Sequence, residues 1–419
     1  MQVDSSRDGR KVTSIGNSLT IKTKKEMKKN LFMVAAVALM ALVSCNKEEI
    51  NNGVQEPASD IVFVAEFDQE ADTKIALGDL VDGVRKTTWV AGDQIKINGT
   101  VFSAQADGAS TEFKTTTAFD ETAKTFRAVY PASSYISTTA VDIPASQNGT
   151  FAGASIAVAE SSTTSLKFNN LVTILKFQVP VNCSKVTFES TASIAGRITV
   201  NYNDGVITPN YAEVTQPNKT INVTGTFVPG TDYYVAVKPG THTFTVKIDG
   251  YLSKVSTKAV TLERSRIMNL GTLPALEKFG WGLVGQHQGW DITKPTEMYK
   301  VYDGVGDNNV NDVYAVLDVK LSDNGFKFAK IGLSNWNSSN TYFGAWTKSS
   351  GKQYYNFTND CGLGNWYGMW TDSCAGQPEN IGVDDWNQKY DVYIKMTQYY
   401  PNSQNMNYTI VKAGTAMTF

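Results

Sequence analysis

Residues 333–370 combine aromatic rings, side-chain amides and many Gly and Ser residues without a helical or strand period. A hydrophobic core does not interleave rings with amides in this way. Aromatic faces stack on flat apolar faces, and amides supply directional hydrogen-bond donors and acceptors around them. A pyranose ring with its fringe of hydroxyl groups needs both, so the segment predicts a carbohydrate-binding surface. Its rings and amides include Trp336, Tyr342, Phe343, Trp346, Tyr354, Tyr355, Phe357, Trp366, Tyr367, Trp370, Asn335, Asn337, Asn340, Asn356 and Asn365.

The side chains that most enzymes use are scarce. The chain has two histidines, His242 and His287, and neither has a Cys or a second His at metal-ligand spacing. A zinc site or a His-based triad is therefore not expected. A glycosidase needs only two carboxylates, and the sequence alone leaves such a pair open. We predict a non-catalytic protein without a cofactor. His242 is expected at the surface, and His287 is expected to be solvent-exposed, with contact to sugar as its alternative.

One spacing of oxygen ligands is typical of a calcium loop. Asp307, Asp312 and Asp318 lie in or next to a run rich in Asn and Asp, and the last follows the first by eleven positions. The run has no Gly at its sixth position, where the sharp turn of a calcium loop needs one. A solvated Asn/Asp hairpin loop is the favoured interpretation, and no metal site is predicted.

Length and charge narrow the class of protein. The chain has 419 residues, of which 42% are hydrophobic and 19% charged. This length predicts two to four domains, and this composition is sufficient for buried cores. The formal net charge is -2, and Lys and Arg form no long run outside the N-terminal leader. Nothing would neutralise a phosphate backbone, so nucleic acid is not an expected partner.

The leader predicts export and a lipid anchor. Lys28 and Lys29 precede an apolar run at residues 31–43, which is shorter than the roughly 20 residues that a spanning helix needs. The run ends in Leu42-Val43-Ser44-Cys45, which resembles a bacterial lipobox and implies diacylation of Cys45. Residues 46–49 resemble the charged tag of lipoproteins on the outer face of the outer membrane. A plain secretory signal with an incidental Cys is the alternative, and the residues before Met27 are expected to be an upstream extension.

Three cysteines follow Cys45. Cys361 and Cys374 lie 13 residues apart, and in an oxidising compartment a disulfide between them would close a loop worth about 3 kcal/mol. The sequence does not set their Cα separation, so the unpaired state stays open. Cys183 is expected to be a small buried hydrophobe.

Alternating apolar and polar residues begin after a solvated tether at residues 46–59. Residues 61–67 read as a strand, and residues 94–102 as two strands around an Asn-Gly turn. No segment before Pro274 shows a helical stripe, so this region is expected to be all-β. A second block is expected to start at Leu166, after a Ser/Thr-rich joint at residues 161–164.

Residues 60–274 resemble the fimbrillin-like lipoproteins, which consist of two tandem β-sandwich domains. The resemblance implies sandwiches at residues 60–164 and 165–274, with polymerisation by strand exchange on an open edge. Taken by themselves, Trp89 reads as a core ring and Tyr130-Pro131 as a strand end. The motifs that carry the resemblance are Thr88-Trp89, Gly92-Asp93-Gln94-Ile95, Tyr130-Pro131-Ala132-Ser133, Phe168-Asn169-Asn170-Leu171-Val172, Leu262-Glu263-Arg264-Ser265-Arg266 and Leu270-Gly271.

Residues 276–419, called here the C-terminal module, contain seven of the eight tryptophans. The order of their motifs resembles the starch-binding domains of outer-membrane lipoproteins, which implies an immunoglobulin-like β-sandwich with glucan held in its loops. The motifs are Gly280-Trp281-Gly282-Leu283-Val284-Gly285, Gly289-Trp290-Asp291, Asn324-Gly325-Phe326-Lys327-Phe328, Asn335-Trp336, Tyr342-Phe343-Gly344, Asn380-Ile381-Gly382-Val383 and Tyr390-Asp391-Val392-Tyr393-Ile394.

The same resemblance implies which side chains bind ligand. The platform candidates are Trp336, Tyr342 and Trp346, and the hydrogen-bond candidates are Asn335, Asn337, Asn340 and Lys327. Trp366 and Trp370 belong to an insertion and either extend the platform or pack beneath the loop. From the residues alone, Trp281 and Phe326 are assigned to the core, Trp290 to a structural cap and Trp386 to packing.

These observations together predict an all-β protein of three tandem β-sandwich domains. The expected function is non-catalytic capture of an oligo- or polysaccharide, such as a starch-like glucan, at the cell surface, with a lipid anchor in the outer membrane. The alternative is a fimbrial subunit or tip adhesin with other fimbrial subunits as partners, and an enzyme ranks third. The expected divisions are residues 1–45 (extension and signal peptide), 46–59 (tether), 60–164, 165–274 and 276–419.

Overall fold

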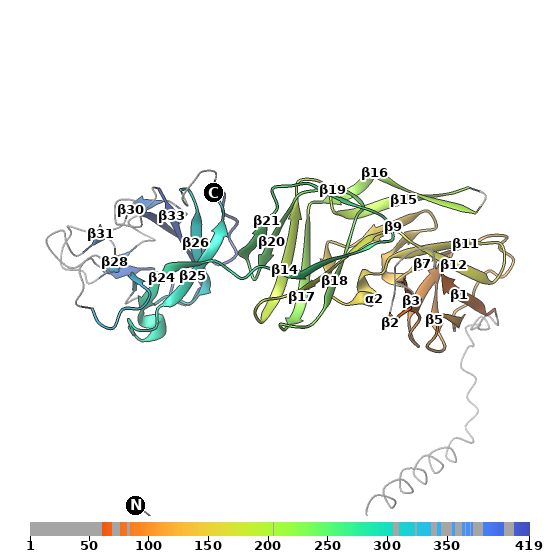
Figure 1. Cartoon of the computed structure of the whole chain (residues 1–419), viewed down its shortest axis with the longest axis horizontal. Helices are drawn as coiled ribbons and strands as arrows, with labels where there is room; N and C mark the ends of the chain where they lie inside the picture. Colours follow the sequence, from red (N-terminus) through yellow and green to blue (C-terminus); the bar gives the residue numbers. More distant parts are fainter. Residues whose placement is uncertain are drawn as a thin grey trace, which may run out of the picture. The chain divides into compact units, whose positions relative to one another are not determined.

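The computed structural model describes residues 61–68, 76–81, 84–203, 205–304, 310–322, 325–336, 342–344, 354–356, 363–364, 366–368, 370–371, 380–397 and 406–419. The regular elements in these parts of the chain are almost all strands (Figure 1). The α-helix α2 (Phe151–Ala154) is four residues long, and no helix in the described ranges is long and apolar enough to cross a membrane. The prediction of an all-β fold is confirmed.

Seven strands near the start of the described chain close into a barrel, in the order β1-β12-β11-β7-β4-β5-β6. In β1 buried and exposed residues alternate strictly, so every second side chain enters the barrel core. Closure pairs both edges of the sheet, which an open sandwich sheet does not do. The predicted first sandwich is therefore a barrel. Its strands are β1 (Phe63–Phe67), β4 (Gln94–Ile97), β5 (Thr100–Ala104), β6 (Ser110–Lys114), β7 (Phe126–Tyr130), β11 (Ala157–Ser161) and β12 (Ser165–Asn170).

The predicted joint at residues 161–164 is wrong, because residue 161 ends β11 and residues 162–164 form the turn to β12 inside the barrel. β12 runs parallel to β1 and sets Leu166 opposite Ala65. Leu166 and Phe168 are fully buried in the barrel core, so they do not start the second block. A Ser/Thr-rich turn and a Ser/Thr-rich linker have the same composition, which is why the sequence did not separate them.

A second group of sheets shares one large core, in which Phe177 and Phe188 meet edge to face at 5.3 Å. It holds a five-stranded sheet (β10-β17-β14-β20-β21), a three-stranded sheet (β18-β13-β23) and a four-stranded sheet (β16-β15-β9-β8). Because β8, β9 and β10 pair here, this block begins before the predicted residue 165. Its strands are β8 (Tyr135–Ser137), β9 (Ala140–Ile143), β10 (Ser146–Gln147), β13 (Thr173–Gln178), β14 (Cys183–Ser190), β15 (Ala195–Asn203), β16 (Val206–Asn218), β17 (Thr220–Phe227), β18 (Tyr233–Val237), β20 (Phe244–Ile248), β21 (Tyr251–Val255) and β23 (Ile267–Thr272).

Two short ribbons complete this part of the chain. β2 (Ala76–Val81) pairs with β3 (Val84–Thr88), and β19 (Gly240–His242) pairs with β22 (Val260–Leu262). A ribbon of two strands is too small to enclose a core of its own.

The strands of the C-terminal module form one hydrogen-bonded sheet, where two sheets of a sandwich were expected. Along β26, Tyr314 and Val316 face one core while Val313 and Ala315 face another, so this strand is buried on both sides. Trp281 and Phe326 are buried as predicted. The strands are β24 (Lys278–Gly285), β25 (Thr296–Tyr302), β26 (Val313–Val319), β27 (Phe326–Lys330), β28 (Tyr342–Gly344), β29 (Tyr354–Asn356), β30 (Tyr367–Gly368), β31 (Trp370–Thr371), β32 (Asn380–Gly382), β33 (Tyr390–Met396) and β34 (Met406–Lys412).

Three predictions about single side chains are wrong. His242 is 1% exposed, with its Nε2 2.9 Å from the Lys238 carbonyl oxygen, and His287 is half-buried. Trp386 is 53% exposed instead of packed. Its loop is fixed by hydrogen bonds, since the Asp385 carbonyl accepts from the Tyr390 hydroxyl at 2.7 Å, so the indole is not needed to hold it.

The Asn/Asp-rich run is not a fully solvated loop. Asp312 is 2% exposed and its Oδ2 lies 2.8 Å from Lys300 Nζ. Asp318 pairs with Lys389. In the ranges that the structure describes, no group of three or more His, Cys, Asp or Glu side chains is placed to hold a metal ion, and residues 305–309 lie outside those ranges.

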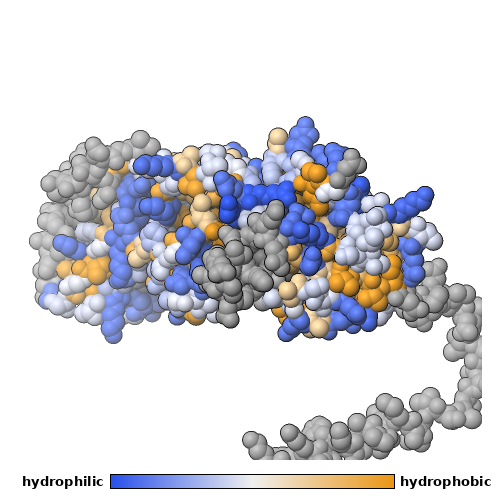
Figure 2. All heavy atoms as spheres, turned by 45° about the vertical axis from the view of Figure 1, so that its right-hand side comes forward, coloured by the Kyte–Doolittle hydropathy of each residue, from blue (hydrophilic) through white to orange (hydrophobic). Residues whose placement is uncertain are grey.

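Exposed hydrophobic side chains are spread over many strands. Figure 2 shows them as small groups among hydrophilic residues on the face that it draws. Val64 on β1, Val101 on β5 and Val206 on β16 are 42%, 38% and 62% exposed, and they come from separate sheets or separate strands. Scattered exposure of this kind is ordinary for a folded surface and indicates no interface by itself.

Candidate functional site

Two tryptophans cover one face of the β24–β27 pair in the C-terminal module. The antiparallel register sets Val284 opposite Lys327 and Gly282 opposite Ala329. Residues opposite each other on neighbouring strands point to the same face, so Lys327 lies on the face that carries Val284 and Ala329. Buried Val284, Ala329 and Ile292 form the base against which Trp290 and Trp336 pack. We call Trp290, Trp336, Lys327 and Asn335 the tryptophan patch.

The loop that carries Trp290 is held by several hydrogen bonds. It follows the 3-10 turn η2 (Gln286–Gln288) and ends with Gly289 and Trp290 at φ values of 76° and 58°. The left-handed region costs a non-glycine residue roughly 1–2 kcal/mol, so the surroundings must hold Trp290 there. Its backbone N–H donates to the Gly285 carbonyl at 2.9 Å, and the Gln288 amide exchanges two 2.8 Å bonds with the Asp291 backbone. The indole is thus presented on a rigid turn.

The two rings are close but not stacked on each other. Their centroids are 6.2 Å apart with planes tilted by 54°, and each residue is half-buried. Asn335 is exposed beside Trp336, and Lys327 is half-buried on β27. Ring faces with an amide and an ammonium group nearby can stack on a sugar ring and hydrogen-bond its hydroxyls.

Two more predicted residues lie next to this patch by strand register. β28 pairs with β27 and sets Tyr342 opposite Ala329, and β31 pairs with β28 and sets Trp370 opposite Gly344. The remaining predicted residues lie outside the described ranges and stay predictions. They are Asn337, Asn340, Trp346, Cys45, Cys361 and Cys374.

Trp366 is placed in a different cluster from the tryptophan patch. Its ring is 6.4 Å from that of Phe419, and the Lys395 ammonium lies 6.0 Å from its centroid. It packs against the cluster that contains Val301 and Val411. Of its two predicted roles, packing is the one that these contacts describe.

His287 lies three residues before Trp290 along the chain. Burial lowers its pKa to about 4, and its Nε2 lies 3.1 Å from the Thr296 hydroxyl. The ring is therefore neutral at physiological pH.

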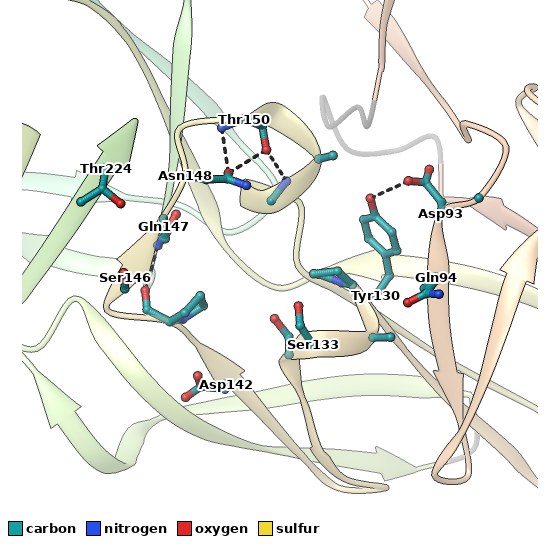
Figure 3. A pocket seen from close by; sticks show the side chains of 17 residues that line it. Asp93, Gln94, Tyr130, Ser133, Asp142, Ser146, Gln147, Asn148, Thr150 and Thr224 are labelled. Carbon is teal, nitrogen blue, oxygen red and sulfur yellow. Dashed lines mark hydrogen bonds between the residues drawn. The ribbon is translucent and has the colours of Figure 1, made fainter. Parts of the chain in front are cut away.

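A second site, which the sequence did not predict, is a polar cavity of about 690 Å³ (Figure 3). Side chains reach it from the start of β4, from the 3-10 turn η1 (Ala132–Ser134), and from β9, β10, α2 and β17. Each of them is an ordinary turn or strand residue in sequence, so no local pattern marks the cavity. Its labelled residues are Asp93, Gln94, Tyr130, Ser133, Asp142, Ser146, Gln147, Asn148, Thr150 and Thr224.

Both carboxylates of the cavity have pKa values above the usual range. Burial raises the pKa of Asp93, and hydrogen bonds from the Val90 backbone N–H and the Tyr130 hydroxyl oppose the rise in part. Burial also raises the pKa of Asp142, against the effect of Arg197, which lies opposite it on β15. Figure 3 shows Tyr130 pointing at Asp93.

No family model matches the chain, and no curated protein matches its sequence. Among solved structures, three similar chains are each described as a "putative cell adhesion protein". The one from Bacteroides ovatus ATCC 8483 has 13% identity and a TM-score of 0.32, over 52% of this chain and 93% of that one. The one from Bacteroides uniformis ATCC 8492 has 15% identity and a TM-score of 0.29, over 51% and 93%. The one from Bacteroides fragilis NCTC 9343 has 11% identity and a TM-score of 0.25, over 51% of this chain and 93% of that one.

With so few identical residues, these structures do not assign a function to this chain. Their descriptions name no starch-binding domain, so the resemblance of residues 276–419 to such domains stays a prediction.

Proposed function

We propose that the chain is a non-catalytic glycan-binding protein of the cell surface, and that the tryptophan patch is its binding site. The supporting observation is that the half-buried rings of Trp290 and Trp336 lie 6.2 Å apart on a buried base, with Lys327 on the same face of the sheet and Asn335 next to Trp336 in sequence. Rings held in this way lose little conformational freedom on binding, which favours affinity. The surface location rests on the predicted lipidation of Cys45.

The composition of the patch fits capture better than turnover. It consists of two indoles, one amide and one ammonium group, whereas glycoside hydrolysis needs two carboxyl groups across the scissile bond. A single site of this kind binds weakly, and several copies on one cell surface would gain strength by holding the same polymer. Starch-like glucan is the ligand class that the resemblance implies.

Replacing Trp336 with alanine is expected to weaken glycan binding by the full chain about 30-fold, which corresponds to about 2 kcal/mol. Trp336 packs at the edge of the base, so its loss removes stacking area without opening a core. Isothermal titration with maltooligosaccharides and other soluble glycans measures the change. Trp290→Ala is expected to show a loss of the same order.

Trp386→Ala serves as the matched control, because Trp386 is 53% exposed and belongs to none of the hydrophobic clusters. Its affinity should stay within twofold of the wild type. Equal losses in all three variants, or full affinity in Trp336→Ala, would remove the patch as the site. Circular dichroism of each variant separates lost binding from lost folding.

A second candidate function is assembly into fimbriae by strand addition. The three-stranded sheet leaves β23 at its edge, and an apolar cavity of about 300 Å³ lies beside it. Met268 and Leu270 line this cavity together with the core residues Phe188 and Val246. An exposed edge next to an apolar groove is the geometry that accepts a strand from another subunit.

Leu270→Lys is expected to abolish strand addition at this edge. Leu270 is 38% exposed, so the lysine can reach water without unfolding the sheet, while its charge opposes burial of an added strand. SDS-resistant ladders extracted from cells are the measurement, with Val206→Lys on β16 as the control at another exposed apolar residue. If ladders persist in Leu270→Lys, or if the wild type forms none, this second function is wrong.

A further inference from the structure

We propose that the polar cavity of Figure 3 is a second binding site, whose ligand is a short neutral saccharide. The cavity belongs to the barrel and the sheets that follow it in sequence, and it shares no residue with the tryptophan patch. The proposal therefore does not depend on the function proposed for that patch.

The size and the lining of the cavity define the ligand class. A volume of about 690 Å³ lies within the range of roughly 300–1,000 Å³ of small-molecule sites. Its 17 lining residues include six exposed residues with a hydroxyl or amide side chain, namely Gln94, Ser133, Ser146, Asn148, Thr150 and Thr224. Hydroxyls and amides both donate and accept, which matches a ligand whose own groups are hydroxyls.

The charge of the lining argues against an anionic ligand. The charged side chains among the lining residues are Asp93 and Asp142, and neither Lys nor Arg is among them. A phosphate or uronic acid would meet two carboxylates and no compensating cation. Both carboxylates are already engaged, Asp93 by Val90 and Tyr130, and Asp142 by the nearby Arg197 charge. The Asp142 charge is therefore offset in part by Arg197, and a cation is the rival ligand that the experiment below includes.

The walls of the cavity are rigid before any ligand binds. The Gln147 amide donates to the Ala236 carbonyl and accepts from the Ala236 N–H, both at 2.8 Å, which fixes β10 against β18. The Asn148 Oδ1 accepts from the Thr150 hydroxyl at 2.8 Å, and the Thr150 hydroxyl accepts from the Gly153 N–H at 3.1 Å. Figure 3 shows the hydrogen bonds among Asn148, Thr150 and the Gly153 N–H along one wall. Polar groups held in place in this way lose little entropy on binding.

Two substitutions test the site through its shape. Thr224→Trp places an indole in the cavity, and Thr226→Trp is its matched control, since both threonines are exposed on β17 and only Thr224 is among the lining residues. Gly153→Ala is the second variant, because a Cβ there would lie 2.7 Å from Asn148 Oδ1 and displace that amide.

The experiment uses the full chain carrying Trp290→Ala and Trp336→Ala, so that the tryptophan patch does not contribute. Saturation-transfer NMR and isothermal titration are run with maltose, cellobiose and lactose, with digalacturonic acid, and with calcium chloride alone. We expect at least one neutral disaccharide to bind, with affinity reduced at least tenfold by Thr224→Trp and by Gly153→Ala and changed less than twofold by Thr226→Trp.

Several results would overturn the proposal. These are no binding of any neutral disaccharide, equal or tighter binding of digalacturonic acid, or affinity that Thr224→Trp leaves intact. Calcium binding that Asp93→Asn or Asp142→Asn abolishes, without sugar binding, would show a cation site instead. The single variant Trp336→Ala tests only the function proposed for the tryptophan patch, so its result neither supports nor overturns the cavity site.

Discussion

Replacing Lys300 with alanine is expected to destabilise the C-terminal module by about 3–5 kcal/mol. The Lys300 ammonium lies 2.8 Å from Asp312, 2.9 Å from Glu277 and 3.2 Å from Asp303. The side chains of Lys300 and Asp312 are only 7% and 3% exposed. Without the lysine, Asp312 would be left as a buried charge without its cation, which costs far more than a surface ion pair contributes.

Lys300 is charged whenever the module is folded. Burial alone would lower the pKa of Lys300, but hydrogen bonds to Asp312 and Glu277 outweigh it, and the pKa lies above the usual lysine range. Urea unfolding followed by tryptophan fluorescence measures the loss. Lys278→Ala is the control, because the Lys278–Glu297 pair is exposed and its loss should cost less than about 1 kcal/mol. Similar midpoints for the two variants would show that the buried pair does not carry this stability.

Much of the barrel could be predicted from alternating apolar and polar residues and from the residues of its tight turns. The Asn98-Gly99 turn is present, with φ values of 46° and 95°, and it joins β4 and β5 in the register that a two-residue hairpin requires. Trp89 is in the core and β7 ends at Tyr130, as expected. These features are local, so the residues that determine them lie next to each other in the sequence.

Features that depend on distant pairing were not predictable. β10 has two residues and pairs with β17, more than 70 positions later, and no periodic pattern is visible in so short a strand. The polar cavity depends on the same pairing, since it brings Ser146 to the strand that carries Thr224. An isolated Ser or Thr is common in any turn, so its role there is visible only in three dimensions.

The tryptophan patch was predicted in part. Trp336, Asn335 and Lys327 were named from sequence, and the structure places Trp336 and Lys327 on the same face of the sheet. Trp290 was assigned to a cap, because a Gly-Trp-Asp turn says nothing about which loop it approaches. The 45 positions between Trp290 and Trp336 are bridged by β24 and β27, whose register no short motif reveals.

Replacing Trp89 with alanine is expected to destabilise the barrel by about 3–5 kcal/mol. Trp89 is fully buried, and its ring lies within 4.5–5.4 Å of those of Phe67, Phe113, Tyr130 and Phe168. Its Nε1 donates to the Ala65 carbonyl at 2.8 Å. The variant loses these contacts, leaves a cavity in a closed barrel and deprives a buried carbonyl of its partner.

Trp89→Phe separates these contributions, because it keeps an aromatic ring and removes the Nε1 donor. Trp89→Phe should destabilise the barrel less than Trp89→Ala does. It should destabilise it more than the control Val90→Ala, which should cost about 0.5 kcal/mol because the Val90 side chain is 43% exposed. Trp89 also supports Tyr130, which holds Asp93 in the polar cavity, so Trp89→Phe is expected to weaken disaccharide binding while the barrel remains folded. Thermal unfolding of each variant measures the change in stability, and titration with disaccharide measures the change in binding. A Trp89→Ala barrel as stable as the wild type would show that this aromatic cluster does not carry the fold.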